Sequence, residues 1–380
     1  MSTATTTNAQ WENMIKKDLS NWEQINGTAP FKLVNEEIIG TTVLNSPNSF
    51  LCSKVKYGDF ILEFDTWFDP KMNSGVQFRS ESSADYQDGR VHGYQVELDP
   101  SARAWSGGIY DEARRGWLYT LDKNPAGQKA LKVGDWNHYR LEAIGSSIRT
   151  WINGVPCADL LDSMTPSGFI ALQVHSIGKD SARVGEQVKW KNLRIMTANL
   201  EKFQTKYTPV IPQVSFLDNI LTKREKEEGL LLLFDGKTSK GWMNSKSKVF
   251  PSTGWDIKDG LLAINPASKG QNGGGDIVTV DKYKNFELIA DFLYTSGANS
   301  GIKYFIDTEI DDGSLAGIGC EYQILDEKLH PDAKLGINGN RTLAGLYDII
   351  APKNQRDNGP GKWNRAIIIV RGNKVQHWLN

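Results

Sequence analysis

Acid and amide side chains alternate along residues 95–99, and this pattern suggests chemistry more directly than any other in the sequence. Gln95, Glu97 and Asp99 are separated by single apolar residues, so in an extended strand all three side chains point to one face. A carboxylate on such a face can take a proton from a bound molecule, and a neighbouring amide can donate a hydrogen bond. A solvent-facing polar stripe is the alternative interpretation.

The same face recurs later in the chain with acid and amide exchanged. Residues 319–323 repeat residues 93–97 at an offset of 226 (319 − 93), so Glu321 corresponds to Gln95 and Gln323 to Glu97. Each stretch therefore keeps one carboxylate and one amide, two positions apart on one face. This exchange makes both stretches candidate sites.

A second polar face is predicted for residues 73–79, where Asn73, Gln77 and Arg79 share one side of a strand. An arginine can hold a developing oxyanion with two donors, whereas a lysine offers a point charge. The corresponding later positions are Asn299, Lys303 and Phe305. A salt bridge on the sheet surface is the alternative role for these charges.

Histidines and a charged turn supply the remaining candidates. His92 precedes the acid–amide face and His175 follows a predicted strand, and a histidine can transfer protons near neutral pH, although a structural role is as plausible for each. The charged turn at 110–115 could grip the polar groups of a ligand or could pair only with itself. Its candidate ligand-binding residues are Tyr110, Glu112 and Arg114.

These candidates belong to a pattern that occurs twice. Residues 73–75 return at 299–301 with an offset of 226, and residues 151–153 return at 378–380 with an offset of 227. So long a period indicates duplication of a whole domain. We therefore expect a first domain at 11–196, a linker at 197–229 with a short helix begun by a capping box at residues 222–225, and a second domain at 230–380.

The fold class follows from hydrophobic alternation of period two, seen for example at 60–68 and 286–292. Many short strands with glycine-rich turns predict two all-β, antiparallel sandwiches or jelly rolls. The second domain has no counterpart of residues 154–196, so we expect it to be truncated at its C-terminal end.

Composition excludes several classes of function. The net charge is −1 with both signs interspersed, which argues against a nucleic-acid groove or a membrane-surface patch. The three cysteines form neither a disulfide framework nor a metal-ligand pair, and no apolar run approaches a membrane span. No signal peptide is visible in this sequence.

Several motifs together resemble the 3-keto-disaccharide hydrolase domain family. They are residues 73–79, 91–99, 107–112, 136–137, 170–175 and 190–193, and later 233–242, 299–302, 319–326, 346–347, 363–364 and 377–380. The resemblance implies a concanavalin-A-like jelly roll that cleaves glycosides already oxidised to a ketone at C3. It also implies a periplasmic or extracellular location.

On that resemblance, the expected reaction starts by removal of the C2 proton, continues by elimination at C1 and ends with hydration. We expect Glu97 or His92 to be the base, Arg79 the oxyanion clamp and His175 an acid. The expected substrate-binding residues are Asn73, Gln77, Gln95, Asp99, Tyr110, Glu112, Arg114, Asn137, Asn299, Lys303, Glu321, Gln323, Asp326, Tyr347 and His377.

Three further alternatives stay open at this point. Asp99 and Asp326 could contribute oxygens to a Ca²⁺ site, although no ligand spacing is diagnostic. The same fold could serve as a non-catalytic carbohydrate-binding module. It could also be an ordinary glucanase with two catalytic carboxylates.

Overall fold

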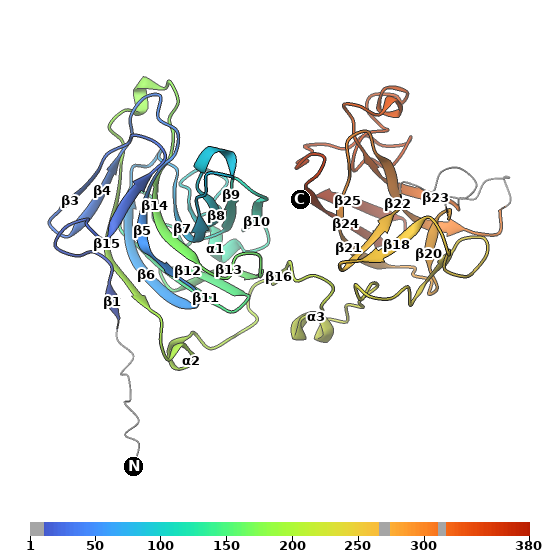
Figure 1. Ribbon diagram of the computed structural model, residues 1–380, viewed down its shortest axis with the longest axis horizontal. Helices are drawn as coiled ribbons and strands as arrows, with labels where there is room; N and C mark the ends of the chain where they lie inside the picture. Colours follow the sequence, from blue (N-terminus) through green and yellow to red (C-terminus); the bar gives the residue numbers. More distant parts are fainter. Residues whose placement is uncertain (1–10, 266–273, 311–316) are drawn as a thin grey trace, which may run out of the picture. The chain divides into compact units, whose positions relative to one another are not determined.

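The computed structural model describes residues 11–265, 274–310 and 317–380, and it consists mainly of β-strands (Figure 1). The chain divides into two compact units, Met1–Leu217 and Asp218–Asn380. Its helices are short: α1 (Pro125–Gln128), α2 (Leu200–Phe203) and α3 (Lys223–Glu227). No helix within the described ranges is long and apolar enough to cross a membrane.

The first unit is a β-sandwich of two large sheets, coloured blue to green in Figure 1. One sheet runs in the order β16 (Val214–Ser215), β13 (Val155–Leu161), β12 (Ser147–Ile152), β11 (Asn137–Ile144), β6 (Phe60–Phe68), β15 (Gln187–Met196), β4 (Glu37–Thr41) and β3 (Phe31–Val34), with β1 (Glu12–Asn13) on β15. The other runs β10 (Gly116–Tyr119), β9 (Ile109–Glu112), β8 (His92–Leu98), β7 (Ser74–Glu81), β14 (Gly168–Val174), β5 (Ser49–Tyr57) and β2 (Trp22–Ile25).

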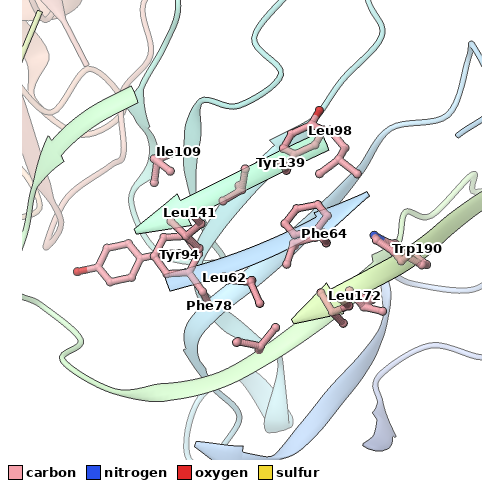
Figure 2. Close-up of a cluster of buried hydrophobic side chains, with 14 of the residues drawn as sticks. Leu62, Phe64, Phe78, Tyr94, Leu98, Ile109, Tyr139, Leu141, Leu172 and Trp190 are labelled. Carbon is pink, nitrogen blue, oxygen red and sulfur yellow. The ribbon is translucent and has the colours of Figure 1, made fainter. Parts of the chain in front are cut away.

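Alternate residues of both sheets meet in one hydrophobic core (Figure 2). Phe64 of β6 stacks on Tyr139 of β11 with ring centroids 5.1 Å apart, and Phe78 of β7 stacks on Tyr94 of β8 at 5.4 Å. Because successive strand residues point to opposite faces, burying Tyr94 and its alternate neighbours places Gln95 and Glu97 on the outer face of their sheet. The period-two alternation thus decides which side of the sheet carries the polar residues.

The second unit, yellow to red in Figure 1, is also built from antiparallel strands. Its sheets in the described ranges are β21 (Phe286–Leu293), β24 (Trp363–Arg371) and β25 (Lys374–Leu379); β22 (Asn299–Asp307) and β23 (Ile318–Leu325); β17 (Trp242–Asn244) and β20 (Ile277–Thr279); and β18 (Trp255–Lys258) and β19 (Leu261–Ile264). A smaller core around Tyr322 and Ile368 joins the β21–β24–β25 sheet to the β22–β23 pair.

The strand pairs that carry the candidate residues share one register. Gly75 pairs with Glu97 between β7 and β8, and Gly301 pairs with Gln323 between β22 and β23, each residue shifted by 226 (301 − 75 and 323 − 97). Both pairs are interrupted by a bulge in which a non-glycine residue has positive φ, 45° at Arg79 and 55° at Phe305. The repeat seen in the sequence therefore coincides with a repeat in hydrogen-bonding pattern.

Asn137 belongs to a loop clamp, and its expected role in substrate binding is wrong. Its side chain is buried, and its Oδ1 accepts hydrogen bonds from Lys132 N (2.8 Å) and Asn153 Nδ2 (2.9 Å). Asn364 accepts in the same way from Asn358 N (3.0 Å) and Asn380 Nδ2 (2.7 Å). The clamp therefore satisfies turn amides in both units.

The segment between residues 197 and 229 is partly attached to the first unit. β16 pairs in parallel with β13, and Pro212 O accepts a hydrogen bond from Tyr119 OH (2.7 Å). Further on, Thr222 Oγ1 accepts from Glu225 N (3.0 Å) while the Glu225 carboxylate accepts from Thr222 N (2.7 Å). This reciprocal pair is the capping box at the start of α3.

A buried ionic network fixes the turn between β9 and β10. The Asp111 carboxylate accepts from Arg114 Nε and Arg115 Nε (both 2.7 Å), and Asp162 accepts from Arg115 Nη1 (2.7 Å) and from Tyr94 OH. Arg114 Nη1 also donates to a threonine hydroxyl. Arg114 is thus committed to a self-paired turn, and its expected contact with sugar hydroxyls is wrong.

We predict that Arg115→Ala lowers the free energy of unfolding of the first unit by about 3–5 kcal/mol, because Asp111 and Asp162 would lose a buried partner. Urea denaturation would measure the change. Arg194→Ala is the matched control: this half-exposed arginine pairs with Glu63, and its loss should cost about 1 kcal/mol or less. Equal effects of the two substitutions would contradict the assigned role of the network.

Candidate functional site

A pocket of about 750 Å³ lies over the outer face of the seven-stranded sheet of the first unit. Most of its wall comes from strands β8, β9, β10 and β14 and from the loops next to them. The lining residues that the sequence had identified are Asn73, Gln95, Glu97, Asp99, Tyr110, Glu112 and His175. The acid–amide face thus forms part of a cavity wall rather than a solvent-facing stripe.

Glu97 is the buried carboxylate of this wall, with 4% of its surface exposed. Its Oε1 accepts a hydrogen bond from Asn73 Nδ2 (2.7 Å) and its Oε2 accepts one from Gln95 Nε2 (2.9 Å). Burial raises the pKa of Glu97 to about 7, although these two hydrogen bonds act in the opposite direction. A carboxylate with such a pKa can take and return a proton near neutral pH.

A chain of amides holds Gln95 in place behind Glu97. Gln95 Oε1 accepts from Gln77 Nε2 (2.8 Å), and Gln77 Oε1 accepts from Ser80 Oγ (2.7 Å). Gly75 leaves room for this arrangement, because a Cβ atom there would lie 2.2 Å from Gln95 Cδ. Gln77 is fully buried and does not line the pocket, so its expected direct contact with substrate is wrong and it positions Gln95 instead.

Arg103 is a pocket cation that the sequence analysis missed. Its Nε and Nη2 donate to Asp99 Oδ2 at 3.0 and 2.6 Å, and its guanidinium carbon lies 4.8 Å from the ring centroid of Trp105 and 4.9 Å from that of Trp117. Nη2 also lies 3.8 Å from Glu97 Oε1. Arg103 follows Asp99 by four residues, and this spacing of opposite charges was the available signal for the pair. Both residues lie in a loop, however, where sequence spacing does not determine where a side chain points.

The rest of the rim is polar and aromatic. Tyr110 packs edge-on against Trp117 with centroids 5.2 Å apart, and burial raises the pKa of its hydroxyl. Glu112 accepts from Arg90 Nη2 (3.0 Å). His175 Nδ1 donates to Ser176 O (2.8 Å), which leaves its Nε2 as the nitrogen able to exchange a proton.

Two of the four expected catalytic residues lie away from the pocket lining. Arg79 is buried, and its guanidinium donates to Gly58 O (2.9 Å), Gly145 O (2.8 Å) and Asp59 Oδ1 (2.8 Å). The bulge turns this side chain out of the alternation, so it cannot serve as the oxyanion clamp. The ring of His92 stacks on that of Tyr86 with centroids 3.9 Å apart, and His92 does not line the pocket. Of the two expected bases, Glu97 and His92, only Glu97 therefore lies in the pocket wall.

The second unit places its candidate residues on the equivalent strands. Gln323 Nε2 donates to Asn299 Oδ1 (3.0 Å), which parallels the pairing of Glu97 with Asn73. Lys303 Nζ is 2.8 Å from Asp276 Oδ2, and burial raises the pKa of the neighbouring Glu321. The carboxylate of this face therefore occupies the position that Gln95 has in the first unit.

The other candidates of the second unit hold its framework together. Asp326 accepts from the backbone N–H of Gly297 (2.8 Å), and Tyr347 OH donates to Asp332 (2.9 Å). His377 lies between Ala344 O and Tyr304 OH, and burial lowers the pKa of its ring. These contacts are structural and do not bring the three residues into one site.

Both carboxylates proposed for Ca²⁺ are engaged by other groups, and the calcium site stays a prediction. Asp99 is neutralised by Arg103, and Asp326 accepts backbone N–H groups of its own turn. Within residues 11–265, 274–310 and 317–380, no group of three or more His, Cys, Asp or Glu side chains could hold a metal ion.

Comparison with known proteins agrees with the resemblance read from the sequence. A stretch of 164 residues is 40% identical to a 3-keto-disaccharide hydrolase of Bacteroides thetaiotaomicron, covering 40% of this chain and 56% of that protein. The chain thus spans about half the length of this curated relative.

Solved structures show more distant likenesses. A carbohydrate binding module from Bacillus subtilis is 18% identical, with a TM-score of 0.31 over 46% of this chain and 95% of that one. A Bacillus subtilis protein of unknown function with a galectin-like fold is 11% identical, with a TM-score of 0.36 over 50% of this chain and 94% of that one.

The model of one family, described as the 3-keto-alpha-glucoside-1,2-lyase-like domain, matches residues 10–196 and 229–380. These two stretches include the pocket of the first unit and the corresponding strands of the second. The chain therefore belongs to the 3-keto-alpha-glucoside-1,2-lyase-like domain family.

Proposed function

We propose that the first unit cleaves 3-keto-glycosides and that Glu97 is the base that removes the C2 proton. The observation that carries this proposal is a buried carboxylate in a pocket, with a pKa raised to about 7 and with both oxygens oriented by amides. A ketone at C3 acidifies the C2 proton, so a carboxylate of this basicity is suited to the step. The name of the curated relative supports the substrate class.

The proposed reaction balances as an elimination followed by hydration. Glu97 takes the C2 proton, and the C2–H electrons form a C2–C3 enolate whose charge lies on the C3 oxygen. The enolate then reforms the ketone, makes a C1–C2 double bond and expels the C1 substituent, which takes a proton. Water can add to C1 while Glu97 returns a proton to C2, which gives the free 3-keto sugar.

Two other pocket residues are suited to the remaining roles. Arg103 supplies a fixed positive charge near Glu97 and takes the role expected of Arg79, stabilisation of the enolate oxygen. His175 lines the same pocket with Nδ1 engaged, so its Nε2 can protonate the departing oxygen. In this proposal each residue acts within a preorganised wall.

We further propose that the two units are tandem copies of one jelly-roll domain, since their β-pairings repeat at a constant offset. The second unit has Gln323 at the position of Glu97, so it lacks the proposed base and is better suited to binding a sugar than to cleaving it. The periplasmic or extracellular location stays a prediction from the family resemblance.

We predict that Glu97→Gln lowers turnover of a 3-keto-glucoside by about 10²–10⁴-fold, because a general base contributes about that much. Release of the leaving group from the 3-keto-glucoside and from its unoxidised parent would be followed side by side. Glu321→Gln is the matched control in the second unit and should leave turnover within about twofold. Wild-type rates in Glu97→Gln would rule out Glu97 as the base, and cleavage of the unoxidised sugar would favour an ordinary glucanase.

We predict that kcat/KM rises with pH along a limb whose midpoint is about 7, because the base must be ionised. Asn73→Ala removes a hydrogen bond that lowers the pKa of Glu97, so the midpoint should move upward by about one pH unit. A pH profile of each protein would show this. A midpoint that stays in place, or moves to lower pH, would contradict the assignment.

A further inference from the structure

One buried side chain of the pocket wall has no use in the reaction described above. Gln173 of β14 is fully buried and lines the pocket, and neither its Nε2 nor its Oε1 has a hydrogen-bond partner among the described residues. A buried amide without partners destabilises a fold, because both polar atoms lose their hydration without replacement. The other buried amides of this face, Gln77 and Gln95, are fully engaged with neighbours.

Strands β14 and β8 pair with opposite edges of β7, so Gln173 and Glu97 lie on opposite sides of Gly75. Ala171 pairs with Gln77 and Leu172 with Val76, so the same register sets Gln173 beside Gly75. Gly75 in turn pairs with Glu97 on its other side. Two strand spacings of about 4.8 Å each therefore separate the backbones that carry the base and the unpartnered amide.

The residue between them is Gly75, and its missing Cβ atom leaves room for the Gln95 side chain to lie across the bottom of the pocket. The backbones that carry Glu97 and Gln173 lie about 10 Å apart, and their two side chains extend into the space above. The space that remains between these side chains is suited to one sugar ring with its hydroxyls. A ring whose C2 faces Glu97 then presents its opposite edge, with the oxygens on C4 and C6, toward Gln173.

We propose that Gln173 is a specificity-determining residue that recognises two oxygens on the edge of the sugar ring opposite C2, the hydroxyls on C4 and C6. Its Nε2–H donates to one hydroxyl oxygen and its Oε1 accepts from the other hydroxyl. The choice of these two oxygens rests on the proposed function, which places C2 at Glu97. The existence of a ligand for this amide does not rest on it.

The test separates ligand binding from structural support by replacing the amide with an apolar side chain of similar size. Gln173→Leu removes two unpartnered polar atoms, so the melting temperature should stay within about 2 °C of the wild type or rise. Gln77→Leu, the matched control, breaks a partnered amide chain on the same face and should lower the melting temperature by several degrees, about 2–8 °C.

Affinity would be measured by calorimetry with 4-nitrophenyl 3-keto-α-glucoside in a Glu97→Gln background, which prevents turnover. Adding Gln173→Leu should weaken binding by about tenfold to a hundredfold, because two hydrogen bonds are lost. The 4-deoxy and 6-deoxy analogues should bind the Glu97→Gln protein more weakly than the parent sugar, yet bind the double variant about as well as the parent does.

The outcomes distinguish this inference from the proposed function. Affinity retained within about twofold in the double variant, or a melting temperature that falls as in Gln77→Leu, would overturn the role of Gln173. If Gln173→Leu weakens binding but the Glu97→Gln protein binds the 4-deoxy and 6-deoxy analogues as tightly as the parent sugar, the assignment to C4 and C6 is overturned. Binding by the wild type without any cleavage would sink the proposed function and leave Gln173 as a ligand-binding residue, whereas no binding at all would sink both.

Discussion

The pairing of β7 with β8 is the constraint on which the pocket depends. It sets Gly75 opposite Glu97 and Gln77 opposite Gln95, so the two pocket-lining side chains, Glu97 and Gln95, are backed by a buried amide and by a glycine that leaves them room. Beyond the bulge, Arg79 is anchored to backbone carbonyls of distant turns, which fixes where the regular pairing ends. A slip of one residue would turn Glu97 into the core, where the carboxylate would have no amide donors.

The two units show which of these features belong to the framework. Both keep the register, the positive-φ residue of the bulge and the asparagine clamp at the end of the central hairpin. They differ in which position carries the carboxylate, Glu97 in one and Glu321 in the other. Backbone geometry is thus shared, whereas the position of the carboxylate depends on a side chain that the same backbone can exchange for an amide.

Much of the fold could be predicted from the sequence, because alternation with period two reports which side of a strand is buried. The all-β fold class was predicted in this way and is confirmed by the sheets of the structure. The same reasoning placed Gln95 and Glu97 on one face, and both line the pocket. What alternation reports is the direction of a side chain within a regular strand.

Prediction was weaker wherever a side chain leaves a regular strand. Arg79 lies in a bulge and Arg114 in a turn, and their partners come from segments that are distant or that fold back locally. Arg103 was missed for the same reason, since a loop does not reveal where its guanidinium points. Gln173 lies in a regular strand, but its importance comes from the absence of partners among the described residues, which only three-dimensional packing reveals.

Gly75 also limits how this pocket can diversify. Any other residue there would bring a Cβ atom to 2.2 Å from the Gln95 side chain, so this position is closed to substitution while Gln95 keeps its place in the pocket wall. Lys71, Arg90 and Ser101 lie on loops at the rim, where side chains can change without disturbing strand pairing. New ligand preferences would therefore evolve by exchange of these loops around an unchanged strand framework.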